Sequence, residues 1–240
     1  MAVDLYAGPL TRYYLGDWEN VGQAWARENG VPYQVVRPEG DQNTEGKAQL
    51  DPEAIRTAIC EWRGIMSTGL GENLGVPLDW DEDPASPYFT DRPHWDGYAG
   101  LLLLAAHEER PELDPPKVVA SEWREDPAYA AAVKEDFANT EYLHILAPEL
   151  WLPTDFPFTF RFMDLTGHEM NIGSLPRLLE QLELLNERTY KGDPETRLAW
   201  RSAAPEPGGP FSAAACYGLS VFLDLAEQAI AHRLPLKLDY

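Results

Sequence analysis

The sequence is poor in cysteine, and this shortage excludes one class of protein. Only Cys60 and Cys216 occur in 240 residues, and they lie far apart. Two cysteines at this spacing do not make the disulfide framework that stabilises small secreted domains. Each falls in an apolar segment with a helical pattern, so we expect both to be small buried hydrophobic residues.

Positive charge is also scarce. The chain carries 19 Lys and Arg against 40 Asp and Glu, which gives a formal net charge of −21. The acidic excess is spread over both halves of the chain rather than gathered in a tail. Because nucleic acids and anionic membranes both attract Lys and Arg, we expect no nucleic-acid and no membrane partner. An acidic surface of this kind either keeps a protein in solution or attracts a basic protein.

Long apolar runs and targeting signals are missing as well. The longest apolar stretches, residues 98–106 and 211–223, are shorter than the roughly 20 residues that a membrane-spanning helix needs. The first residues show no basic region followed by an apolar run, so we expect no secretory signal and a cytoplasmic location.

Short catalytic motifs are absent too. The sequence contains no Gly-rich phosphate loop, no dinucleotide fingerprint, no Gly-x-Ser-x-Gly and no Cys-x-x-Cys, so we predict no cofactor. This absence does not exclude an enzyme, because active sites also assemble from distant positions.

Apolar and aromatic residues are abundant and predict a large core. Apolar residues make up 44% of the chain, with 8 Trp, 11 Tyr and 8 Phe among them, and each aromatic side chain buries a large area. We predict a single domain over residues 1–240. The proline-rich stretch 111–116 is the best candidate for a weak subdivision, but neither side of it shows a complete pattern of its own.

Periodicity and capping signals predict more helices than strands. Helices are expected over 18–28 with Asp17 as N-cap, from 51, over 95–110, over 126–139, from 174, and over 211–233. Strands are expected at 2–7, 33–36, 118–120, 158–163, 168–172 and 234–240, the last at an edge of the sheet. Strands and helices do not alternate regularly, which predicts an α+β fold, helix-rich, with a small and mainly antiparallel sheet. The helices over 95–110 and 211–233 should be the most buried, because each has a long apolar run.

A β-hairpin over 158–172 is the most specific local prediction. Residues 158–163 and 168–172 flank Asp164-Leu165-Thr166-Gly167, a turn with glycine at the position that favours a positive φ. Ser174 is then expected to cap a helix whose leucines form one apolar stripe.

The segment 64–93 is predicted to be the longest irregular stretch, and it contains an acidic run. Its acidic residues meet no Lys or Arg before Arg92. The run Asp79-Trp80-Asp81-Glu82-Asp83 begins like a calcium loop, but Pro84 and Thr90 stand where that loop needs Gly and Glu. We therefore predict no metal site here. A solvated loop and a contact surface for a basic partner remain, and the partner surface would consist of Asp79, Trp80, Asp81, Glu82, Asp83, Asp91 and Trp95.

Two further polar clusters are explained by local structure. The first is Asp91-Arg92-Pro93-His94-Trp95-Asp96, where carboxylates and an imidazole occur within six residues, but these also suit the first turn of a helix. The second is His168-Glu169, which follows the predicted turn and has no second His at zinc-protease spacing.

Three classes of function remain open, one of them a housekeeping or structural protein with no separable site. The first is a binding module that recognises a basic protein, for example as its inhibitor. In its acidic, compact profile the chain resembles immunity proteins, although no motif carries this resemblance. The alternative is a small hydrolase or transferase with a site assembled from scattered His, Asp, Glu and Arg. An enzyme should show a deep pocket with polar groups from several elements, and a binding module should show an acidic face with exposed aromatic residues.

Overall fold

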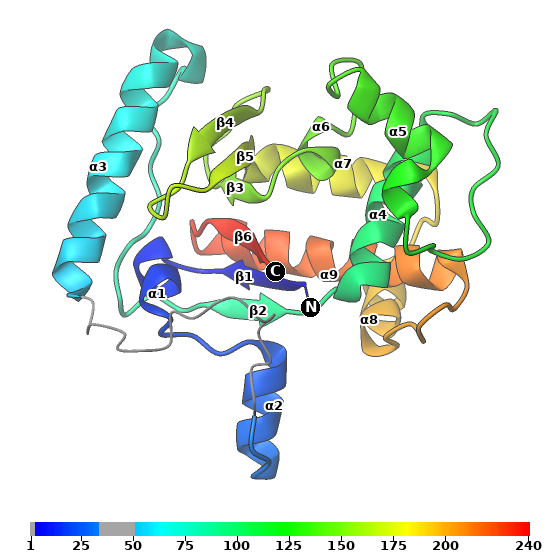
Figure 1. The fold of residues 1–240 in the computed structure, drawn as a ribbon, viewed down its shortest axis with the longest axis horizontal. Coiled ribbons are helices and arrows are strands. Elements are labelled where there is room, and N and C mark those ends of the chain that lie inside the picture. The colour runs from blue at the N-terminus through cyan, green and yellow to red at the C-terminus, as the bar shows by residue number, and fades with distance from the viewer. Residues whose placement is uncertain (1–2, 34–50) are drawn as a thin grey trace.

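A computed structural model describes residues 3–33 and 51–240 of the chain. The strand expected at 33–36 falls, apart from Tyr33, outside the described residues. In the described part, one open sheet of six strands has the order β2-β1-β6-β3-β5-β4 (Figure 1). The strands are β1 (Asp4–Ala7), β2 (Phe89–Asp91), β3 (Leu150–Leu152), β4 (Phe160–Met163), β5 (Glu169–Ser174) and β6 (Leu236–Asp239). All neighbours pair antiparallel except β3 and β5, which run parallel.

Helices outnumber strands, which confirms the predicted α+β fold. The helices are α1 (Leu10–Leu15), α2 (Val21–Asn29), α3 (Pro52–Leu70), α4 (His94–Glu108), α5 (Pro127–Lys134), α6 (Leu143–Leu146), α7 (Leu175–Arg188), α8 (Pro194–Ser202) and α9 (Phe211–Ala231), with short 3-10 turns η1 (Gly71–Leu74) and η2 (Trp123–Glu125). In the part of the chain that the structure describes, no helix is long and apolar enough to cross a bilayer.

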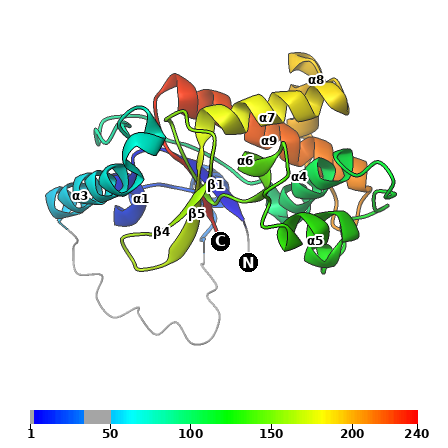
Figure 2. The same cartoon turned by 90° about the horizontal axis from the view of Figure 1, so that it is seen from above.

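Helices cover both faces of the sheet, as the view from above shows (Figure 2). On one face α4, α7 and α9 bury the larger core, and on the other α1 and α3 bury a smaller one. Alternation along the strands sends neighbouring side chains to opposite faces: Trp151 belongs to the larger core, and Leu150 and Leu152 belong to the smaller one. The predicted burial of the two apolar helices is confirmed, because Leu102 and Phe222 are each only 1% exposed.

Helices α4 and α9 pack closely because glycine lies at their crossing. A Cβ placed on Gly218 would collide with the backbone carbonyl of Gly97. A Cβ on Gly100 would lie 2.8 Å from the carbonyl carbon of Ala214. The glycines therefore allow the two backbones to approach at a distance that a larger residue would prevent.

The predicted hairpin is confirmed. Strands β4 and β5 pair antiparallel around the turn, and Gly167 has a φ of 83°. The Asp164 carboxylate accepts hydrogen bonds from the backbone N–H groups of Thr166 and His168, at 2.8 and 2.9 Å. Strand β5 leads directly into α7, where the Ser174 hydroxyl accepts a hydrogen bond from the Arg177 N–H.

Several predictions of helix ends, of one strand and of cysteine burial were wrong. Helix α2 begins at Val21 rather than near residue 18, since Asn20 and Gln23 form a complete capping box. Only an isolated bridge between Val118 and Pro210 forms where a strand was expected at 118–120. Helix α5 ends at Lys134 instead of 139. Cys60 is exposed and Cys216 is half-buried, so the prediction that both are buried was also wrong.

The segment 64–93 is more regular than its composition indicated. Helix α3 continues through Gly64 to Leu70, because Ile59, Trp62 and Met66 form a buried stripe on it. A 3-10 turn and strand β2 account for further parts of the segment. The final strand was expected at an edge but lies in the interior of the sheet, between β1 and β3.

Candidate functional site

Two residues of the predicted acidic surface, Trp80 and Glu82, are buried. The Glu82 carboxylate accepts hydrogen bonds from the backbone N–H groups of Leu10 and Thr11, at 2.9 and 2.8 Å. It also accepts from the Thr11 hydroxyl and from the Trp80 indole N–H. Glu82 therefore satisfies the free N–H groups at the start of α1, and it ties the acidic loop to that helix.

The other carboxylates of the acidic run lie nearer the surface and have partners within the chain. Asp79 forms ion pairs with Arg63, at 3.4 Å, and with Arg233, at 2.5 Å. Asp81 accepts hydrogen bonds from the Ser86 hydroxyl and the Asp83 N–H. The hydrogen bond from Ser86 is the main cause that holds the pKa of Asp81 below its ordinary value. These contacts organise the loop, and binding of a basic partner by the run stays a prediction.

Asp91 and Trp95 have different surroundings from the acidic run. Asp91, on β2, accepts from the Arg201 guanidinium at 2.7 Å. Trp95, in the first turn of α4, lines a cavity of about 460 Å³. Of the seven residues predicted for a partner surface, Trp95 alone lines this cavity.

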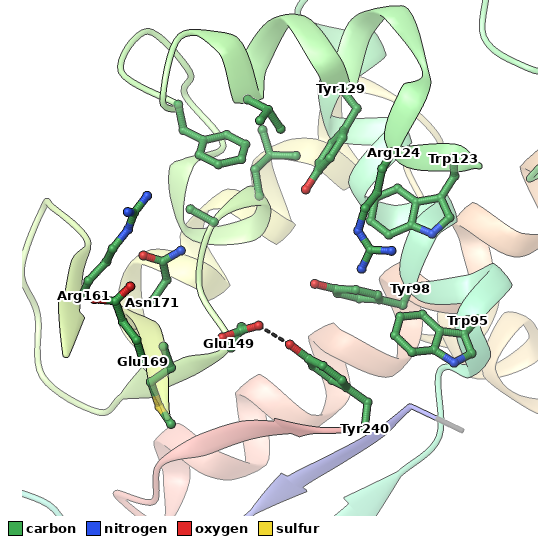
Figure 3. A pocket seen from close by; sticks show the side chains of 15 residues that line it. Trp95, Tyr98, Trp123, Arg124, Tyr129, Glu149, Arg161, Glu169, Asn171 and Tyr240 are labelled. Carbon is green, nitrogen blue, oxygen red and sulfur yellow. Dashed lines mark hydrogen bonds between the residues drawn. The ribbon is translucent and has the colours of Figure 1, made fainter. Parts of the chain in front are cut away.

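The cavity beside Trp95, called the aromatic cleft below, is assembled from elements far apart in the sequence (Figure 3). Helix α4 supplies Trp95 and Tyr98, and η2 supplies Trp123 and Arg124. Further residues come from α5, from the hairpin β4–β5, and from the segments around Ala147 and Tyr240. They are Tyr129, Val133, Phe137, Leu146, Ala147, Glu149, Arg161, Glu169, Met170, Asn171 and Tyr240.

One wall of the cleft is aromatic and holds a guanidinium group. The ring of Trp95 lies 6.1 Å from that of Tyr98 and 5.8 Å from that of Tyr240, centre to centre. The guanidinium carbon of Arg124 lies 4.4 Å above the Trp123 ring and 6.0 Å from the Trp95 ring. Such cation–π contacts hold a charged group against an aromatic face, so the wall presents both flat apolar surface and hydrogen-bond donors.

The opposite wall is polar and of mixed charge. Glu169 and Asn171 on β5 lie beside Arg161 on β4, and all three side chains are visible around the cleft in Figure 3. Glu149 accepts a hydrogen bond from the Tyr240 hydroxyl. Burial and this carboxylate raise the pKa of Tyr240, so its phenol keeps its proton and remains a donor at neutral pH.

The chemistry of the cleft suits binding better than covalent catalysis. Its 15 lining residues include no Ser, Cys, His or Asp, so this part of the described chain holds no hydroxyl or thiol nucleophile beside an imidazole. Residues 3–33 and 51–240 also contain no group of three or more His, Cys, Asp or Glu arranged to hold a metal ion. The lining instead offers flat rings, donors and acceptors that orient a ligand or a partner side chain.

Sequence reasoning identified Trp95 but missed the rest of the cleft. Its residues come from six separate segments, and no local spacing connects them. One local signal was available: Trp123 and Arg124 are adjacent in a polar segment, where an aromatic residue has no core periodicity to explain it.

No family model, no curated protein and no solved structure matches this chain.

Proposed function

We propose that the chain is a protein-binding module for a basic protein, with the aromatic cleft as its anchoring point. The observation that carries this proposal is the composition of the cleft. Trp, Tyr and Arg are the residue types that dominate the binding energy of protein interfaces. Seven such residues line this one cavity: Trp95, Tyr98, Trp123, Arg124, Tyr129, Arg161 and Tyr240.

The arrangement of the cleft supports the same function. Interfaces combine an apolar centre with a polar rim, and here the aromatic wall faces Glu169, Asn171 and Arg161. A cavity of about 460 Å³ accommodates one or two side chains of a partner. The rings of Trp95 and Tyr98 would stack on them, and Glu169 would accept hydrogen bonds from a basic group.

The net charge supports a basic partner. At −21, the chain attracts a positively charged protein over a distance and raises its rate of association, more than it adds to the final affinity. Asp83 and the other carboxylates of the acidic run contribute to that field although they have partners within the chain. An inhibitor of a basic protein, such as an immunity protein, is one function that this combination serves.

The test compares two exchanges of the same residue type. Trp95→Ala removes a wall of the cleft, and Trp25→Ala removes a tryptophan that is 58% exposed on α2 and does not line the cleft. Proteins that bind the parent in a lysate are identified and purified, and their affinities for the parent and for both variants are then measured. The purified partner should bind Trp95→Ala about 10- to 30-fold more weakly than the parent, as expected for a hot-spot residue.

Salt provides the second measurement. The association rate of the purified partner should fall as ionic strength rises, because steering by net charge is screened. A partner whose affinity is equal for the parent and for Trp95→Ala, with both proteins folded by circular dichroism, would contradict the cleft as the anchor.

A second candidate function is hydrolysis, favoured by one observation. Glu149 and Glu169 come from different segments and line the same cleft, and a pair of carboxylates on either side of a bound sugar can act as acid and base. The test is a panel of chromogenic aryl glycosides. Glu169→Gln should abolish any turnover and Asp155→Asn, outside the cleft, should leave it unchanged; turnover that survives Glu169→Gln would exclude this role.

A further inference from the structure

A second cavity, of about 280 Å³, lies next to the aromatic cleft and has Lys237 in its wall. Glu149 and Tyr240 line both cavities, and the hydrogen bond between these two residues is visible in Figure 3. The remaining lining residues of the second cavity are Tyr13, Asp164, Thr166, His168, Leu238 and Asp239. This cavity, called the lysine cavity below, therefore combines an amine, several carboxylates and hydroxyl groups.

Lys237 is a buried lysine in an interior strand. Its neighbours on β6, Leu236 and Leu238, belong to the core under α4 and α9. Alternation along the strand places Lys237 on the opposite face of the sheet, where it is only 7% exposed. Its Nζ atom lies 5.2 Å from the centre of the Tyr13 ring.

The carboxylates around Lys237 are engaged with other groups. Asp239 accepts a hydrogen bond from the Tyr13 hydroxyl at 2.6 Å, and Asp164 accepts the hydrogen bonds of the hairpin turn. Within residues 3–33 and 51–240, no hydrogen bond or ion pair holds the Lys237 ammonium group itself. The Nζ atom is not sealed from solvent, because His144 Nε2 is the only fully buried side-chain nitrogen or oxygen without a hydrogen-bond partner among the described residues. The amine of Lys237 therefore opens into the lysine cavity.

Burial also changes the acidity of this amine. Desolvation lowers the pKa of Lys237, while Asp164, Asp239 and Glu149 act in the opposite direction and limit the decrease. A larger share of this amine is therefore neutral at a given pH than of an exposed lysine. Lysines that act as nucleophiles in proteins are of this kind, buried and adjacent to a cavity.

We propose that Lys237 is a nucleophile that captures a small aldehyde or ketone as a Schiff base in the lysine cavity. This activity goes beyond partner binding and does not depend on the aromatic cleft. The neutral Nζ forms a bond to the carbonyl carbon, and the electron pair of the carbonyl bond moves to oxygen. The nitrogen loses one of its protons and the oxygen gains one, which gives a neutral carbinolamine. The carbinolamine then loses water, with a proton donated by solvent or by His168, and leaves a protonated imine.

The surroundings favour this product over other ligands. A protonated imine keeps the positive charge of the lysine, and Asp164, Asp239 and Glu149 stabilise that charge. The same three carboxylates repel anions, so phosphate or a carboxylic acid is not the expected ligand. A cavity of 280 Å³ lies just below the range of about 300–1,000 Å³ of drug-sized sites, which restricts the carbonyl compound to a small one.

Reductive trapping tests the proposal on the unmodified 240-residue chain. The protein is incubated with propionaldehyde and sodium cyanoborohydride at neutral pH, digested, and its labelled lysines are quantified by mass spectrometry. Lys117, Lys134 and Lys191 are exposed and serve as internal references. Lys237 should be labelled faster than these three, because burial lowers its pKa while exposed lysines are almost entirely protonated near pH 7.

The opposite result would overturn the proposal. Burial alone predicts that Lys237 is the slowest of these four lysines to react, so a rate equal to or below that of Lys134 refutes the proposed role. The variant Asp239→Asn should speed labelling of Lys237 several-fold, since Asp239 is one of the carboxylates that raise the pKa of this amine and its loss leaves more of the amine neutral. The matched variant Asp83→Asn, on the acidic loop, should leave the rate unchanged, and equal rates in the two variants would remove the carboxylates from the argument.

Discussion

The crossing of α4 and α9 can be tested by adding one methyl group. In Gly218→Ala the new Cβ would collide with the carbonyl oxygen of Gly97, and this obstacle is backbone that no side-chain rotation can move. Overpacking of this kind costs about 1–3 kcal/mol, sometimes more. Alanine gains about 0.5–1 kcal/mol of helix propensity over glycine, so we expect a net loss of up to about 2.5 kcal/mol in the free energy of unfolding.

A matched substitution separates the clash from the general effect of glycine. Gly64→Ala lies inside α3, where a Cβ would meet no atom within 4 Å, and it should stabilise the protein by about 0.5–1 kcal/mol. Urea denaturation of the parent and both variants, followed by circular dichroism, measures the difference. The reasoning would be refuted if Gly218→Ala were as stable as Gly64→Ala, because the helices could then separate at no cost.

Three further predictions concern single side chains. Burial lowers the pKa of His144 to about 4 from an ordinary value near 6.5, so between these pH values the native state binds fewer protons than the unfolded state, and the free energy of unfolding should fall by about 3 kcal/mol as the pH drops through this window. The variant His144→Asn should flatten the pH profile of urea unfolding. An unchanged profile would contradict this prediction. Glu82→Gln should destabilise the protein by about 1–3 kcal/mol, because it weakens the hydrogen bonds to α1. Asp83→Asn should change stability by less than about 0.5 kcal/mol. Equal shifts in the melting temperatures of the two variants would contradict the structural role given to Glu82. Gly167→Val should cost about 1–3 kcal/mol through the positive φ at that turn, as measured by thermal unfolding, and a neutral effect would mean that the turn relaxes.

Local signals predicted the parts of the fold that local interactions determine. The turn at Gly167 and the cap at Ser174 depend on residues within a few positions of one another, so the hairpin and the start of α7 were predicted correctly. The length of α3 was not, because its glycines indicated a break, while burial of Trp62 and Met66 against the sheet extends the helix.

Long-range pairing explains the remaining differences. Strand β3 has only three residues, too few for an alternating pattern, and it exists because β6 and β5 flank it. The aromatic cleft was unpredictable for the same reason: Trp95 and Tyr240 meet although more than half of the chain separates them. Their neighbourhood follows from the pairing of strands, which no spacing within the sequence records.

The pairing of β1 with β6 gives the fold an almost circular connectivity. Asp4 lies opposite Asp239 in an antiparallel ladder, so the start of β1 and the end of β6 lie side by side in the sheet (Figure 1). Joining Tyr240 to Val3 through a short Asn-Gly turn would convert these strands into an ordinary hairpin. New ends could then be opened in the proline- and glycine-rich connection between α8 and α9, at the surface. Such a circular permutant would connect the helices and strands in a different order along the chain and would keep their arrangement in space.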